Sequence, residues 1–198
     1  MGSSLFKIDD IGTGTAAEKL ESKHSKTSTA DMLVQINSKA KHLLTKIKDD
    51  LGHNTHVDFV TAGELSIHQF ILYFATLFGK CNVYISSWAI KEEPARVLLS
   101  LVQDGTIQKL YGVFDYRIKT LDAKHFQLIE KAFSAYALTK NHSKVVIIES
   151  ETLSLVIVSS ANLSNNPRIE CGFISTIDKT VQFHKEWMTE VLNGKTVY

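Results

Sequence analysis

The chain has 198 residues, of which 44% are hydrophobic and 22% are charged, so it has the composition of a globular protein that can bury one core. Its formal net charge of +1 excludes attraction of nucleic acid or anionic lipid by the whole surface, so any polyanion site must be a local patch. No segment reaches the roughly 18 apolar residues of a membrane span, and the amino terminus lacks a secretory-signal pattern. We therefore expect a soluble, cytoplasmic protein.

The sequence first predicts a loose segment and then a helix. Residues 12–29 are rich in Gly, Ser, Thr and Lys with little apolar periodicity, so we expect residues 1–30 to be a loose N-terminal segment. Between Leu33 and Leu51, apolar residues recur every three or four positions, which predicts one amphipathic helix. Residues 31–198 are then expected to form a single domain that includes this helix.

Beyond this helix, short β-branched or aromatic runs alternate with helix-like segments. The expected strands are residues 57–61, 83–89, 107–114, 135–139, 144–149, 153–159 and 170–177. The expected helices are residues 64–78, 93–104, 122–133 and 179–192. This alternation predicts an α/β fold, with a mixed and mostly buried β-sheet of about seven strands flanked by helices.

Several single residues are expected in the core. Cys81 and Cys171 are too few for a disulfide framework or a thiolate metal cage, and both lie in apolar, strand-like contexts. They are therefore predicted to be buried free thiols. Trp88 and Trp187 are most simply interpreted as core aromatics at strand or helix spacing.

One predicted hairpin carries polar residues at its open end. A polar connection at residues 149–152 joins two expected strands and is short enough to require antiparallel pairing. If the turn centres near residues 150 and 151, His142 lies opposite Ser159 or Ser160. The two apolar strands would then act as a rigid arm that holds these polar side chains together.

The residue types at this open end suit attack on a phosphate ester. His142 and Lys144 share one face, as do Ser160 and Asn162, because residues two apart in a strand point the same way. An imidazole can be the nucleophile, an ammonium can neutralise phosphate oxygens, and an amide and a hydroxyl can donate hydrogen bonds. This chemistry needs no metal and no cofactor. A histidine nucleophile also needs a partner that fixes its tautomer, and Glu170 is the candidate.

Residues 141–172 resemble the signature of the phospholipase D superfamily, in which H-x-K-x4-D is followed by G-[ST]-x-N and then by an acidic residue. The matching residues are His142, Lys144, Ser159, Ser160, Asn162 and Glu170. The resemblance implies the phospholipase D-like fold and a metal-independent phosphodiesterase with a phosphohistidine intermediate. It implies that His142 is the nucleophile, that Lys144 and Asn162 bind phosphate, and that Glu170 orients the histidine.

Two positions depart from this signature, and one nearby residue is a further candidate. Glu149 stands where the signature has Asp, at a position that looks mainly structural in this family. Ser159 replaces the usual Gly and adds a side chain beside the phosphate pocket, which could narrow it. We expect Ser159 and Ser160 at the substrate. Arg168 is either a further substrate contact or a solvated loop residue.

The reaction also needs a general acid for the departing alkoxide, which the family takes from a second histidine. A second H-x-K, formed by His24 and Lys26, lies in the loose segment without flanking strands or a following S-x-N. The sequence therefore favours a homodimer in which one His142 attacks and its counterpart protonates the leaving group. Such a pair predicts a bell-shaped dependence of rate on pH.

The sequence leaves three classes of function open. The first is a dimeric nuclease, because single-signature chains resemble nucleases more than lipases; we expect an endonuclease that prefers DNA to RNA. The second is a nucleic-acid binding module that holds phosphate on the same edge without turnover. The third is a phosphatidyl transferase or lipase, which predicts dependence on a membrane or micelle; no interfacial apolar helix is evident, so no stable membrane association is expected.

Overall fold

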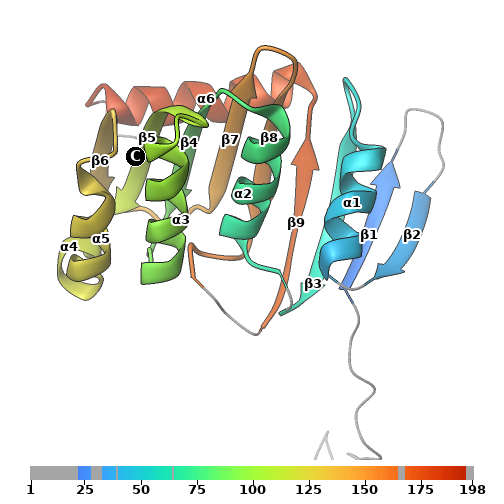
Figure 1. Cartoon of the computed structure of the whole chain (residues 1–198), viewed down its shortest axis with the longest axis horizontal. Helices are drawn as coiled ribbons and strands as arrows, with labels where there is room; N and C mark the ends of the chain where they lie inside the picture. The colour runs from blue at the N-terminus through green and yellow to red at the C-terminus, as the bar shows by residue number, and fades with distance from the viewer. Residues whose placement is uncertain (1–21, 28–32, 39, 64, 165–167, 195–198) are drawn as a thin grey trace, which may run out of the picture.

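The computed structural model describes residues 22–27, 33–38, 40–63, 65–164 and 168–194, and it describes side chains from residue 43 onwards. Nine strands form one sheet with the order β2-β1-β3-β9-β8-β7-β4-β5-β6 (Figure 1). The β4–β5 and β5–β6 pairs are parallel and the other pairs are antiparallel, so the sheet is mixed. The strands are β1 (Ser22–Thr27), β2 (Leu33–Ser38), β3 (His56–Ala62), β4 (Cys81–Ser87), β5 (Ile107–Asp115), β6 (Ala135–Thr139), β7 (Val145–Ser150), β8 (Ser154–Ser159) and β9 (Ile169–Ser175).

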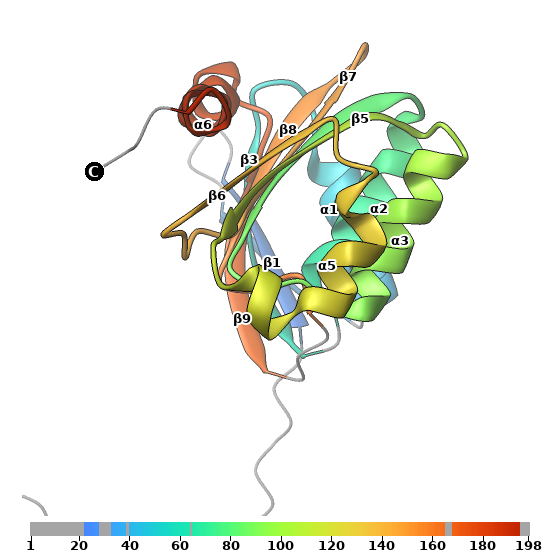
Figure 2. The same cartoon turned by 90° about the vertical axis from the view of Figure 1, so that its left-hand side faces the viewer.

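Helices cover both faces of this sheet. Figure 2 shows α1, α2, α3 and α5 on one face and α6 alone on the other. The helices are α1 (Ala40–Asp50), α2 (Ile67–Phe78), α3 (Glu92–Gln103), α4 (Ile118–Leu121), α5 (Ala123–Glu130) and α6 (Asp178–Leu192). None of the helices within the described ranges is long and apolar enough to cross a membrane.

The seven predicted strands are all present, because their apolar side chains fill two cores on opposite faces of the sheet. In β7, Val146 and Ile148 join the larger core beneath α1, α2, α3 and α5. Val145 and Ile147 point the other way and join the smaller core beneath α6. A strand that is buried on both faces has a continuous apolar sequence, and this is the signal from which β7 was predicted.

The amino-terminal part differs from the prediction. The helix expected from Leu33 begins only at Ala40, and Leu33–Ser38 forms strand β2 instead. The segment expected to be loose contains β1, which pairs with β2 on one side and with β3 on the other. Leu33 and Ile36 are three residues apart, as in a helix, while Val34 and Ile36 are two apart, as in a strand, and pairing with β1 decides for the strand. The division of the chain near residue 30 stays a prediction.

The two cysteines lie in different environments. Cys81 is buried, and burial raises the pKa of its thiol to about 11. Cys171 is exposed, so the prediction of a buried thiol is wrong there. The ladder between β8 and β9 starts at Gly172, which lies opposite Ser159, and Cys171 precedes this residue at the edge of the sheet. Cys171 therefore lacks the cover that the middle of the strand has.

Strand direction brings the ends of several strands that carry predicted site residues, or lead to them, to one edge of the sheet, the lower edge in Figure 1. Strands β4, β5 and β8 run to this edge and end at Ser87, Asp115 and Ser159. Strand β6 also ends there, while β7 and β9 run the opposite way and begin there, at Val145 and Ile169. Loops at such an edge are where open α/β sheets bind ligands. The residues that follow or precede these strand ends are therefore the candidates for a site.

Candidate functional site

His142 and Lys144 lie together at the entry to β7, as the strand spacing predicts. Lys144 Nζ is 3.3 Å from Nδ1 of His142 and donates a hydrogen bond to the backbone oxygen of the same residue at 2.6 Å. The side chain of His142 is exposed and that of Lys144 is half-buried. Burial lowers the pKa of Lys144 below its ordinary value, and the negative charge of Glu170 opposes this shift. The edge thus presents an imidazole beside a partly desolvated ammonium group.

The hairpin register differs from the prediction by about one residue. The backbone N–H of Ser159 donates to the oxygen of Lys144 at 3.1 Å, so Ser159 faces Lys144 rather than His142. The hydroxyl of Ser159 accepts a hydrogen bond from the backbone N–H of Ala161 at 3.1 Å. Its side chain therefore closes the turn that leads towards Asn162.

Glu170 is held by Ser160. The Ser160 hydroxyl donates to Oε2 of Glu170 and accepts a hydrogen bond from the backbone N–H of Cys171 at 3.1 Å. Between the described residues, no hydrogen bond joins Glu170 to His142, whose Nδ1 faces Lys144 instead. A neutral His142 that accepts at Nδ1 carries its proton on Nε2. The orienting role predicted for Glu170 is thus not the contact that this arrangement makes.

Asn162 lies on a loop that is tied firmly to the end of β4. The backbone N–H of Leu163 donates to the Ser87 hydroxyl at 3.3 Å, and its oxygen accepts from the backbone N–H of Lys91 at 2.9 Å. The Oδ1 atom of Asn162 is buried and has no hydrogen-bond partner in the described part of the chain. An orphaned buried acceptor costs about 1–3 kcal/mol. The loop therefore holds this amide in place without satisfying it.

Asn141 anchors the loop that carries His142, and the sequence did not single it out. Its side-chain Nδ2 donates to the Ser86 hydroxyl and to the backbone oxygen of Val113, each at 3.0 Å. Its Oδ1 accepts hydrogen bonds from the backbone N–H and the hydroxyl of Ser143, at 3.0 and 2.7 Å. This buried amide joins β4 and β5 to the entry of β7. It fixes the backbone on both sides of His142.

Trp88 was predicted as a core aromatic, and this is wrong. It follows the end of β4, where it is only half-buried, and its ring centroid lies 6.2 Å from that of His142. Asp115 and Arg117, at the end of β5, also border the site. These residues lie at the ends of predicted strands, which is where site residues are expected. The order of the strands in the sheet, which the sequence does not give, decides that they lie near His142.

Arg168 and Glu149 are the remaining predicted positions. Arg168 is exposed, immediately before β9. Glu149 lies near the other end of β7, about 16 Å from Lys144 along the strand, and forms an ion pair of 2.7 Å with Lys185 on α6. This contact agrees with the structural role expected at that position.

The second H-x-K lies far across the sheet. Contrary to the prediction, His24 and Lys26 are in a strand with neighbours on both sides, since β1 pairs with β2 and β3. In the strand order, β3, β9 and β8 separate β1 from β7. At the usual strand spacing this is about 19 Å, too far for His24 to protonate a leaving group beside His142 of the same chain.

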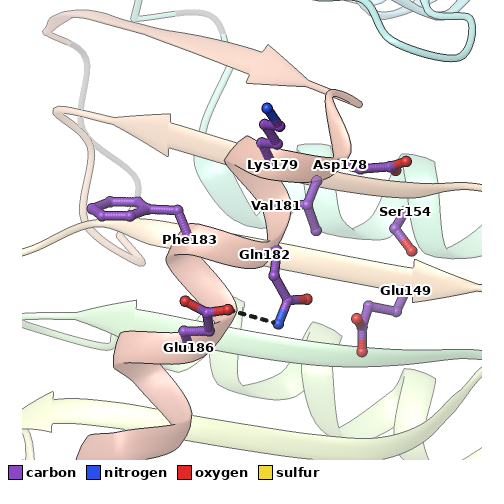
Figure 3. A pocket seen from close by; sticks show the side chains of 8 residues that line it. All are labelled: Glu149, Ser154, Asp178, Lys179, Val181, Gln182, Phe183 and Glu186. Carbon is purple, nitrogen blue, oxygen red and sulfur yellow. Dashed lines mark hydrogen bonds between the residues drawn. The ribbon is translucent and has the colours of Figure 1, made fainter.

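A pocket of about 580 Å³ opens on the face of the sheet that α6 covers, between α6 and the β7–β8 hairpin (Figure 3). Its lining includes the carboxylates of Glu149, Asp178 and Glu186, which would repel a phosphodiester. Glu149 and Ser154 lie at the turn end of the β7–β8 hairpin, so the pocket is distinct from the edge that carries His142. Within the described ranges, no group of three or more His, Cys, Asp or Glu residues is placed to hold a metal ion.

Sheet order, helix cover and the placement of the motif define a phospholipase D-like fold. The solved structures to which the chain is similar include Nuc from Salmonella typhimurium, a phospholipase D family member, with a TM-score of 0.50 and 15% identity over 66% of this chain and 90% of that one. They also include NucT from Helicobacter pylori, with a TM-score of 0.56 and 20% identity over 70% of this chain and 95% of that one.

A third similar structure belongs to a much longer protein. Polyphosphate kinase from Porphyromonas gingivalis matches with a TM-score of 0.58 and 12% identity, over 81% of this chain but only 29% of the kinase. No protein-family model matches the sequence, and no curated protein matches it. At these identities the likeness concerns the fold, and the activity must be argued from the site.

Proposed function

We propose that the protein is a phosphodiesterase, specifically a nuclease, that cleaves through a phosphohistidine intermediate without a metal. The observation that carries this proposal is the contact of His142 with Lys144, whose charge Glu170 of the Ser160–Glu170 pair acts on, at one edge of the sheet. The fold likeness to Nuc, a phospholipase D family member, and to NucT supports the class of reaction.

The proposed reaction has two steps. In the first, Nε2 of His142 attacks phosphorus, the bond to the leaving oxygen breaks, and that oxygen takes a proton from a general acid. In the second, water attacks the phosphohistidine, gives up its proton to the same group and frees His142. The ammonium of Lys144 and the amide of Asn162 stabilise the charge on the phosphoryl oxygens in both steps.

His142 must present a lone pair at Nε2, and the observed contact with Lys144 favours the other tautomer. Because the side chain of His142 is exposed, its ring can turn when substrate binds. Lys144 then donates its hydrogen bonds to the phosphate, and the Nδ1–H group of His142 donates a hydrogen bond to a carboxylate. Glu170, whose charge acts on Lys144, is the carboxylate that we propose for this role.

The general acid is proposed to be the His142 of the partner subunit in a homodimer. Within one chain, the other H-x-K lies on a distant strand, so a single subunit offers one histidine of this motif to the substrate. A two-fold axis at the exposed edge would oppose two such sites. DNA as substrate in preference to RNA, cleavage within a strand, a cytoplasmic location and the lack of stable membrane association belong to the same proposal.

The test is cleavage in the presence of EDTA. Wild-type protein and His142→Ala are incubated with DNA, with RNA and with a chromogenic phosphodiester, and His53→Ala serves as a control because His53 is an exposed histidine remote from the edge. We expect cleavage by the wild type and by His53→Ala, and a loss of at least about 10³-fold in His142→Ala. Undiminished cleavage by His142→Ala would refute the proposal.

A nucleic-acid binding module without turnover is the second candidate, and the ring tautomer favoured by Lys144 is the observation that supports it. In that case the wild type cleaves nothing in EDTA but binds DNA in a salt-sensitive manner. Lys144→Ala then weakens binding, whereas Lys80→Ala, at an exposed lysine near the other end of β4, does not.

A further inference from the structure

An aromatic and cationic cluster borders the nucleophile. The rings of Trp88 and His142 have centroids 6.2 Å apart and planes inclined by 59°. The guanidinium carbon of Arg117 lies 5.4 Å from the Trp88 ring centroid and 5.7 Å from that of Tyr116. Both distances are in the range of cation–π contacts. Trp88, Tyr116 and Arg117 thus form a group of planar side chains, which we call the stacking platform.

The platform is open to solvent. Tyr116 is 53% exposed, which is high for a large aromatic residue, and the Arg117 side chain is 47% exposed. Trp88 is half-buried and adjoins the exposed His142. Aromatic side chains that serve only the core are covered, as Phe70 and Phe114 are in this protein. Burial in the core therefore does not explain why aromatic residues stand at the positions of Trp88 and Tyr116.

The charge of Arg117 is already neutralised. Its Nε donates to Oδ1 of Asp115 at 2.7 Å and a terminal nitrogen donates to Oδ2 at 3.3 Å. Asp115 is buried, and the hydrogen bond from Arg117 lowers the pKa of its carboxyl, so this partner remains an anion. Arg117 is thus a poor clamp for phosphate and offers its planar face instead.

The same carboxylate connects the platform to the nucleophile. Oδ2 of Asp115 also accepts the backbone N–H of Asn141, the residue before His142, at 3.3 Å. One buried anion therefore fixes both the guanidinium plane and the chain at His142. The distance from the platform to a phosphate bound at His142 is set by the fold, as a nucleotide-binding subsite requires.

We propose that the stacking platform of Trp88, Tyr116 and Arg117 binds an unpaired nucleobase next to the scissile phosphate, and so selects single-stranded nucleic acid. Exposed aromatic and guanidinium planes stack on bases of any sequence, and this is how proteins hold single strands. In a duplex, both faces of each base are already stacked on neighbouring bases, so the platform finds no free face. The proposal rests on the proposed function, because it takes the phosphate to lie at His142.

The test measures binding by fluorescence anisotropy in a His142→Ala background, which prevents cleavage. The probes are a labelled oligothymidylate, an abasic strand of the same length and charge, and a duplex. Trp88→Ala is compared with Trp88→Phe, which keeps an aromatic plane, and with Phe183→Ala, an exposed aromatic on α6 that is 64% exposed. Intrinsic fluorescence in a Trp187→Phe background reports on Trp88 alone, since the chain has 2 tryptophans.

We expect Trp88→Ala to weaken oligothymidylate binding about tenfold and to leave abasic-strand binding within about twofold. Trp88→Phe should recover most of the affinity, Phe183→Ala should change nothing, and oligothymidylate should quench Trp88. Equal losses for the oligothymidylate and the abasic strand, or equal wild-type affinity for single strand and duplex, would overturn the platform. The outcomes can be told apart from those of the cleavage test. If the protein cleaves but binds single strand and duplex equally well, the stacking platform is refuted and the nuclease proposal stands. If it does not cleave but shows the expected binding differences, the stacking platform stands and the nuclease proposal is refuted.

Discussion

Replacing Asn141 with alanine removes the side chain that joins β4 and β5 to the loop before β7. The hydroxyls of Ser86 and Ser143 lie 2.5 Å apart and can satisfy each other after the change. The backbone N–H of Ser143 and the oxygen of Val113 instead lose the amide that they contact at 3.0 Å. An orphaned buried group costs about 1–3 kcal/mol, and Ser143 is only half-buried, so losing both contacts should lower the free energy of unfolding by about 2–4 kcal/mol.

A loss of this size should leave the protein folded, because domains are typically stable by about 5–15 kcal/mol. Urea unfolding measures it, and the midpoint should fall by about 1–2 M if the denaturant slope is about 2 kcal/mol per M. In the folded variant, kcat should fall more than tenfold with little change in KM, because His142 loses its fixed position.

Asn193→Ala is the matched control for this change, because Asn193 is an exposed asparagine that follows α6. It should shift the free energy of unfolding by less than about 0.5 kcal/mol. If Asn141→Ala also costs less than that, or if its kcat equals that of the wild type, the network does not hold His142 as argued.

Three further outcomes follow from the structure. Because burial lowers the pKa of Lys144, phosphate binding should weaken with rising pH earlier than for an ordinary lysine, and an alkaline titration should show that Lys144→Arg removes this loss. Glu149→Gln breaks an ion pair with α6 and should cost at most about 1 kcal/mol in urea unfolding while cleavage stays intact. A Cβ at Gly172 would lie 2.1 Å from the backbone oxygen of Val158, so Gly172→Ala should force β8 and β9 apart and lower both thermal stability and activity. Gly52→Ala, whose nearest contact is at 3.6 Å, should do neither.

Much of the fold could be predicted from the sequence because burial leaves a local signal. The strands at β4, β7 and β8 are buried on both faces, so their apolar runs stand out from the helices between them. Strand β2 could not be assigned in this way. Leu33 and Ile36 have a helical spacing and Val34 and Ile36 a strand spacing, so the choice depends on pairing with β1, which is a contact and not a local property.

In the candidate site, too, contacts set by local spacing could be predicted and contacts set by strand pairing could not. His142 and Lys144 could be placed together because residues two apart in an extended segment point the same way, and these two directly precede β7. The bond from Ser160 to Glu170 depends on how β8 and β9 pair, and the contacts of Asn141 and Trp88 depend on which strands are neighbours. Sequence spacing does not determine this order, so the groups that support His142 could be found only in the structure.

The central claim is that His142 takes up the phosphoryl group. A single-turnover reaction with a labelled phosphodiester, quenched in alkali and digested, tests it directly, because phosphohistidine survives base and hydrolyses in acid. We predict a labelled peptide in which mass spectrometry places the phosphoryl group on His142, and no such peptide from His142→Ala. Cleavage that proceeds at full rate while His142 stays unmodified throughout the turnover would contradict the account.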